Sequence, residues 1–175
     1  MRDKAVGLLN KYVLKDEKKE HSFIVESIMT SFAKFLNPDQ IEIWSIAGLL
    51  HDLDCSITSY KLCPQLHGLK AVEILKDENF GNDEIYSIMA AHNEKNGIKA
   101  ESIAQKTIIP ANLMANIISK NIGKNSKNDY IKLDSITILK DIDIFDRQKI
   151  ESIGIKFDNF VNISIDAAKK LFNQI

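Results

Sequence analysis

The sequence contains few cysteines, the residues whose disulfide bonds stabilise many small extracellular proteins. Its 175 residues include only two cysteines, Cys55 and Cys63, too few for a disulfide-stapled scaffold. A bond between the two is compatible with their spacing, but we expect two free, partly buried thiols. The chain also has no internal repeat and no low-complexity segment, so neither a repeat array nor a disordered linker is indicated.

The chain has little excess charge of either sign. Its 23 basic and 24 acidic residues give a net charge of −1, which does not indicate a nucleic-acid groove or a membrane surface. No apolar run approaches the roughly 20 residues of a membrane span. Residues 1–9 mix charged with apolar side chains and lack the apolar core of a secretory signal. We therefore expect a cytoplasmic protein whose partners include neither a nucleic-acid polymer nor a membrane; its oligomeric state is left open.

Several common catalytic motifs are missing as well. The sequence has no glycine-rich phosphate-binding loop, no nucleophile elbow and no paired Cys-x-x-Cys motif. Serine and cysteine nucleophile mechanisms therefore have no supporting pattern.

Apolar residues recur at helical spacing along most of the chain, which predicts an all-α fold. An irregular loop is expected over 54–65, and β-branched residues over 136–144 leave a strand open there. Pro110 should kink or restart the helix that contains it. We expect one domain over 1–175, with a core at about 15–120 and C-terminal helices at about 130–175. Helices are predicted at 2–14, 16–36, 38–53, 65–77, 83–92, 101–121, 133–140, 146–153 and 158–174.

The helix predicted at 38–53 is the most apolar in the chain, and it ends in an unusual way. Trp44 and Leu49 extend its apolar face, so we expect it at the centre of the core. It ends in His51-Asp52-Leu53-Asp54. A buried carboxylate without a partner costs several kcal/mol, so Asp52 needs one. A metal ion suits a neutral imidazole and a carboxylate that point the same way.

The chain has four histidines, His21, His51, His67 and His92, and each falls in or beside a predicted helix. His21 lies on the predicted inner face of its helix, a face that should extend as far as Phe35. A single histidine on an apolar face is more often a satisfied core residue than a ligand. Four of them around one His-Asp pair indicate convergence on a common point.

This ordered set resembles the HD superfamily of metal-dependent phosphohydrolases, most closely its small stand-alone members, over residues 15–120. The resemblance implies an HD-domain-like helical bundle that hydrolyses a small phosphorylated substrate, a nucleotide or a phosphomonoester. It also implies one or two divalent transition-metal ions, of manganese, iron, cobalt, nickel or zinc, with Asp52 bridging if there are two. The implied ligands are His21, His51, Asp52 and the residue at position 112 for one ion, and His67 and His92 for the other.

At position 112 this chain departs from the family, which has an aspartate there. Asn112 can still ligate through its amide oxygen, but it brings no charge. The alternative function is therefore a degenerate domain that binds metal or nucleotide without catalysis. A third hypothesis is oxidative chemistry at a mixed-valent di-iron centre. The cyclic-dinucleotide phosphodiesterase branch is disfavoured, because Cys55 replaces its lysine and its Gly-Tyr-Pro motif is absent.

Further candidate residues lie near the ligands in sequence. Asp52 is expected to serve catalysis as well as metal binding. Asp54 and Glu94 either orient a ligand imidazole or act as general acid or base, or else are solvated carboxylates at helix ends. Lys61 and Lys95 are the expected substrate-binding residues. Lys70 is a further candidate for binding substrate, or else a lysine exposed on the surface. Cys55 is a candidate for contacting the metal or substrate, or else a thiol that only packs in the protein.

Overall fold

The computed structural model describes residues 1–59, 62–122 and 142–173, together with residues 135, 138 and 140. Within these residues the chain is helical and has no strand, which confirms the all-α prediction. Most of the helix expected at 133–140 lies outside the described residues, as does part of the alternative strand at 136–144; Ile144, at the end of that range, begins a helix. The α-helices are α1 (Arg2–Tyr12), α2 (Asp16–Leu36), α3 (Ile41–Leu50), α4 (Leu69–Asp77), α5 (Asp83–Ala91), α6 (Ile103–Asn121), α9 (Ile144–Glu151) and α10 (Phe157–Asn173).

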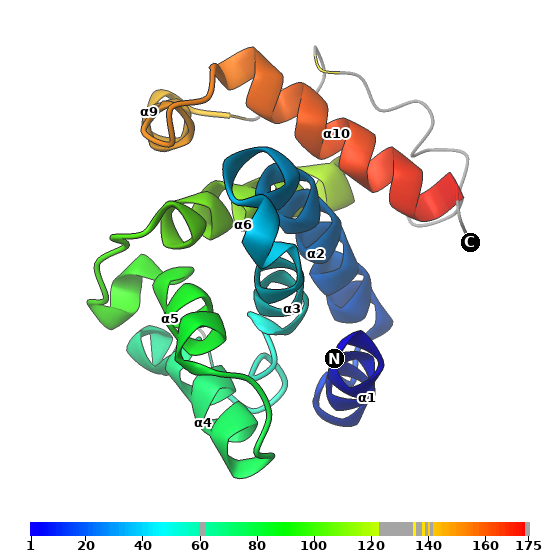
Figure 1. The fold of residues 1–175 in the computed structure, drawn as a ribbon, viewed down its shortest axis with the longest axis vertical. Helices are drawn as coiled ribbons and strands as arrows, with labels where there is room; N and C mark the ends of the chain where they lie inside the picture. The colour runs from blue at the N-terminus through cyan, green and yellow to red at the C-terminus, as the bar shows by residue number, and fades with distance from the viewer. Residues whose placement is uncertain (60–61, 123–134, 136–137, 139, 141, 174–175) are drawn as a thin grey trace.

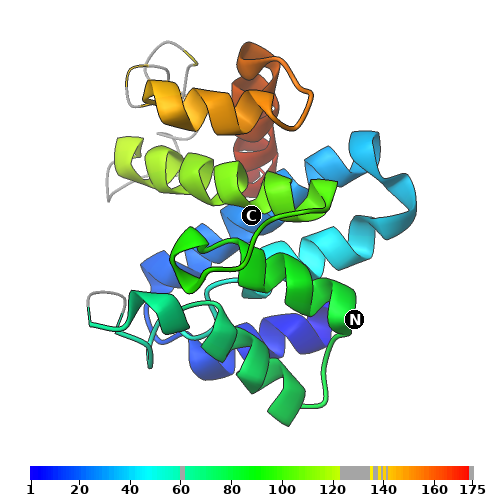
Figure 2. The same ribbon diagram turned by 90° about the vertical axis from the view of Figure 1, so that its left-hand side faces the viewer.

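The helices are arranged around α2, which packs against α3, α6 and α10. Helices α9 and α10 lie at one end of the molecule and α1 and α4 at the other, with α2, α3 and α6 between them (Figures 1 and 2). Short 3-10 turns occur at Pro38–Gln40 (η1), Pro64–Leu66 (η2) and Glu94–Asn96 (η3). Residues from both ends of the molecule join the same buried apolar core.

Helix α3 is buried as its composition predicts. Trp44 and Leu49 are fully buried. At Gly48 the backbone of α2 comes so near that an added Cβ would lie 3.1 Å from the carbonyl oxygen of Val25. The missing side chain therefore lets α2 approach the last turn of α3, the turn that leads into His51.

Two of the helix ends that differ from the prediction affect the positions of His51 and His67. Helix α3 ends at Leu50 rather than residue 53, and the chain continues in tight turns through residue 57. Helix α4 begins at Leu69 rather than residue 65, because Gly68 has a φ of +83°, which an α-helix does not accommodate. His67 therefore lies in an extended link between η2 and α4.

The predicted inner face of α2 was wrong at one position. Phe35 is 71% exposed, because the buried face of the last turns passes through Phe32 and Ala33 instead. Pro110 was expected to kink or restart its helix; α6 runs unbroken through it, so the restart was wrong and the kink stays a prediction. A capping box between Ser102 and Gln105 fixes the start of α6. No helix in the described part of the chain has the length and apolarity needed to cross a membrane.

Phe32 and Phe160 provide a test of the packing between α2 and α10. Their rings are stacked with centroids 4.3 Å apart, and both are fully buried. We expect Phe160→Ala to lower the free energy of unfolding by about 3–5 kcal/mol, because it removes a buried ring and leaves a cavity. Phe35→Ala is the matched control and should change it by about 0.5 kcal/mol or less. Denaturant titration measures both, and equal losses would contradict the packing described.

Candidate metal centre

The four histidines converge where the ends of several elements meet. His21 lies on α2, His51 follows the last residue of α3, His67 precedes α4 and His92 follows the last residue of α5. All four side chains are buried, and so is Asp52. The structure therefore brings together the histidines that the sequence places up to 71 positions apart, from His21 to His92.

One carboxylate oxygen, Oδ1 of Asp52, lies at the centre of this cluster. The Nε2 atoms of His51, His67 and His92 lie 3.3, 3.0 and 3.4 Å from it. The Nε2 atoms of His67 and His92 are themselves 3.1 Å apart. Three ring nitrogens and one oxygen thus share a small buried volume.

The opposite ring nitrogen of each of these histidines faces an acceptor. Nδ1 of His51 donates to the carbonyl of Gly48 at 2.8 Å, and Nδ1 of His92 donates to the carbonyl of Met89 at 2.6 Å. Nδ1 of His67 lies 3.0 Å from Oδ1 of Asp54. Because carbonyl and carboxylate oxygens only accept, the proton of each neutral ring resides on Nδ1. The Nε2 lone pairs therefore face Asp52.

This arrangement fits a metal ion. Among the described residues, Nε2 of His51 finds no hydrogen-bond partner, and Oδ1 of Asp52 faces three ring nitrogens at once. Ligand atoms held about 2.1 Å from one ion at angles of about 90–110° lie roughly 3.0–3.4 Å apart, which the measured separations match. A cation at this point satisfies atoms that otherwise repel one another in a buried space.

The ligand atoms form two groups that share Asp52. The first contains His21, His51 and Asp52, and the second contains Asp52, His67 and His92; within each group they lie within 4.8 Å of one another. Asn112 on α6 joins the first group, since its Oδ1 lies 2.9 Å from Nε2 of His21. Every predicted ligand is thus placed in or beside one of the two groups.

Burial keeps two of the imidazoles neutral and ready to ligate. It lowers the pKa of His51 to about 3, and it also lowers the pKa of His21. For Asp52, burial alone would raise the pKa. The hydrogen bond from His67, whose own pKa is raised, instead holds it well below its usual value. The central carboxylate is therefore ionised.

His67 differs from the other histidines. Its burial would lower its pKa, but hydrogen bonding and charge from Asp52 and Asp54 raise it to about 9. In protein without bound metal, His67 is therefore an imidazolium between two carboxylates. Its proton supplies the positive charge that the cluster requires, and a metal ion must displace that proton.

Asp54 is not the solvated helix-end carboxylate that was one alternative for it. It is fully buried, and its Oδ2 accepts a hydrogen bond from the backbone N–H of Gly68 at 3.1 Å. Its other oxygen faces His67, so Asp54 is placed to orient that imidazole. A Cβ at Gly68 would lie 2.9 Å from Cε1 of His92, so a side chain there would press on a second histidine.

Glu94 forms a contact with a lysine of α9. It is exposed and forms an ion pair with Lys149 of α9, with Nζ and Oε2 2.5 Å apart. Lys70 is likewise exposed and pairs with Glu73. Lys61 lies outside the described residues. Cys55 and Cys63 are free, partly buried thiols, as expected.

A cavity of about 230 Å³ opens beside the cluster, between η3, α6 and α9. His92 and Asn112 line its inner side, and Lys95 and Lys149 contribute positive charge. Lys95 thus lines the space next to the candidate metal centre. Sequence reasoning missed Lys149, because no local signal links α9 to a motif 55 residues earlier.

Comparison with known proteins agrees with this geometry. A family model described as HD domain matches residues 19–148, most of the chain, and the chain belongs to the HD-domain family. The HD domain characterises a superfamily of metal-dependent hydrolases whose members bind divalent metals. No curated protein and no solved structure matches this chain.

The raised pKa of His67 makes metal binding dependent on pH. Below pH 9 a proton competes with the ion for Nε2 of His67, so apparent affinity should rise with pH, by up to about tenfold per unit. Calorimetric titration of chelator-treated protein at about pH 7.5, in buffers of different ionisation enthalpy, should show release of about one proton per ion held by His67.

Asp54→Asn removes one of the two carboxylates that hold this proton and should reduce the release. Asp158→Asn, which changes an exposed carboxylate on α10, is the control and should leave it unchanged. Metal binding without proton release in the unmodified protein would contradict the assignment of His67 as a ligand.

Proposed function

We propose that the protein is a phosphohydrolase that uses divalent metal to hydrolyse a small phosphorylated molecule, a nucleotide or a phosphomonoester. The observation that carries this proposal is the convergence of three Nε2 atoms on the ionised carboxylate of Asp52. The neighbouring cavity provides space for a phosphate beside this cluster, with Lys95 and Lys149 among the residues on its walls. Membership of the HD-domain family supports the reaction class.

The residues of the cluster would hold two metal ions and fix the orientation of their ligands. Asp52, His67 and His92 would hold one ion, and His21, His51 and Asn112 would hold a second that shares Asp52. A bound pair of divalent ions lowers the pKa of water and neutralises phosphoryl charge. Asp54 fixes the ring of His67, and the carbonyls of α3 and α5 fix the rings of His51 and His92. Burial of the cluster strengthens each of these electrostatic interactions.

The donor set favours a transition metal over magnesium. Four imidazoles and one carboxylate suit manganese, iron, cobalt, nickel or zinc, whereas magnesium prefers oxygen ligands. The two groups are not equivalent. The second has His67 backed by the carboxylate of Asp54, which increases the basicity of that ligand. The first relies on the neutral oxygen of Asn112, so we expect its ion to be held more weakly.

Asn112 supports a second candidate function, a domain that binds metal or nucleotide without catalysis. In place of the aspartate that the family has here, an amide oxygen faces His21. One negative charge is therefore missing from the first group. If that group holds no ion at cellular metal concentrations, the protein retains a single ion at the second group.

The proposed reaction predicts phosphate release that depends on added manganese, cobalt or nickel. His51→Ala and the polar variant His51→Gln should each reduce the rate by at least about 100-fold, because His51 contributes to the first group and contacts Asp52. Elemental analysis should show metal loss, and circular dichroism checks that each variant is folded. Phe35→Ala is the control. Metal-replete protein that is inert on nucleotides and on generic phosphomonoesters would refute the proposed reaction.

Replacing Asn112 with aspartate separates the two candidate functions. Asn112→Asp should increase the affinity of the first group for its ion by about tenfold, because it restores a charged ligand. Asn162→Asp is the control: it adds the same charge at an exposed position on α10 and should leave the affinity for metal unchanged. Metal titration followed by phosphate release measures the effect. Activity that appears only in Asn112→Asp would favour the non-catalytic domain.

A further inference from the structure

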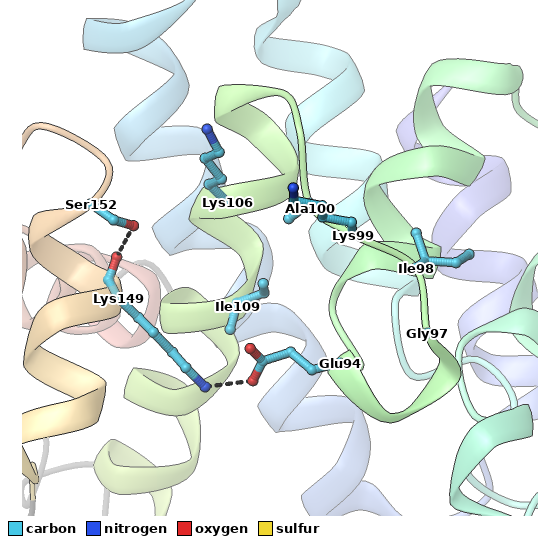
Figure 3. A pocket seen from close by; sticks show the side chains of 9 residues that line it. All are labelled: Glu94, Gly97, Ile98, Lys99, Ala100, Lys106, Ile109, Lys149 and Ser152. Atoms are coloured by element: carbon cyan, nitrogen blue, oxygen red, sulfur yellow. Dashed lines mark hydrogen bonds and ion pairs between the residues drawn. The ribbon is translucent and has the colours of Figure 1, made fainter.

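A larger cavity, of about 440 Å³, shares lining residues with the one beside the metal centre; the side chains that line it are drawn in Figure 3. It lies beside the first turns of α6, between the chain that follows η3 and helix α9. Glu94, Ile109 and Lys149 line both cavities. The two are therefore neighbouring compartments of one space, and the smaller one reaches His92 and Asn112.

The two compartments differ in charge. Among the described residues that line it, the larger has three lysines, Lys99, Lys106 and Lys149, against the single carboxylate of Glu94. The smaller has two lysines, Lys95 and Lys149, against Glu94 and Asp146. The larger compartment thus has an excess of two positive charges and the smaller has none. The excess lies on the side away from the histidines.

The larger compartment also offers apolar surface. Ile98 is 37% exposed, and Ile109 and Ala100 line the same space. Apolar walls with a few charged groups are typical of sites for small organic ligands, and the volume lies in the range of such sites. A carbon skeleton can therefore extend from the smaller compartment along Ile109 while its far end meets the lysines.

Lys149 marks the boundary between the compartments. Its side chain extends from α9 past Ile109 to the carboxylate of Glu94 (Figure 3). Both side chains are about half exposed to solvent, so the pair is weak and can be exchanged. An anionic group of a ligand can replace Glu94 as the partner of Lys149.

We propose that the larger compartment binds a second phosphate group, belonging to a substrate whose reacting phosphate lies at the histidine cluster. This inference rests on the proposed function for the placement of the first phosphate. A phosphate monoester has a charge of about −1.5 to −2 at neutral pH, which matches the excess of two positive charges. A carboxylate would neutralise only half of it. The substrate class is therefore a small molecule with two phosphate groups separated by an apolar moiety.

Binding of unreactive phosphonates tests this site without turnover. Calorimetry on metal-loaded, full-length protein should compare α,ω-alkanediphosphonates of increasing length with the matching alkylmonophosphonates. At the best length, the diphosphonate should bind at least about tenfold more tightly. Equal affinities at every length would overturn the proposal. An ω-phosphonocarboxylate that binds as tightly as the diphosphonate would overturn the assignment of a phosphate.

Three variants assign the effect to named residues. Lys106→Gln should weaken diphosphonate binding by about threefold to tenfold and change monophosphonate binding by less than about twofold. Lys149 lines both compartments, so Lys149→Gln should weaken the binding of the monophosphonate and, by about threefold to tenfold, that of the diphosphonate. Glu94→Gln should instead tighten it, because it removes the competing carboxylate. Lys70→Gln is the control and should have no effect. If the ion pair only fastened α9, Lys149→Gln and Glu94→Gln would shift binding in the same direction, and that result would overturn the proposal.

These experiments distinguish failure of the second phosphate site from failure of the proposed hydrolase function. A selective, lysine-dependent preference for diphosphonates in protein that releases no phosphate from any ester would leave the second anion site standing and remove the hydrolase. Phosphate release without this preference would do the reverse.

Discussion

Mutual repulsion of buried acceptor atoms is the constraint on which the site depends. Oδ1 of Asp52 lies 3.0–3.4 Å from the Nε2 atoms of three histidines, His51, His67 and His92. In a low-dielectric interior this cluster is stable only with a positive charge among its atoms, from a proton or a metal ion. The acceptors behind the rings maintain this orientation, because they fix the proton of each neutral imidazole on Nδ1.

Helix ends provide much of this orientation. The last carbonyls of an α-helix have no partner within the helix. His51 and His92 each follow such an end directly and donate to the carbonyl three residues earlier, at Gly48 and Met89. Gly48 serves the site a second time, since its missing side chain admits α2, which carries His21. The same local arrangement thus positions two ligands, and close packing of α2 on α3 brings a third.

Much of the fold was predictable, because helices depend on local patterns. The order of the helices, the burial of Trp44 and the candidate ligands follow from periodicity and from the motif. The errors occur where packing or backbone conformation overrides periodicity. Phe35 has the right spacing but lies beside the buried face of α2, and the positive φ of Gly68 delays the start of α4.

The sequence by itself determined which elements form and which chemical groups end beside them: four imidazoles and the Asp52 carboxylate, with a neutral amide at position 112. Only the tertiary structure decided which groups meet. The contact of Asp54 with His67 depends on how the turns after α3 pack against the residues that precede α4. The pairing of Glu94 with Lys149 joins residues 55 positions apart. Such contacts are set by the packing of whole helices, and no local periodicity encodes them.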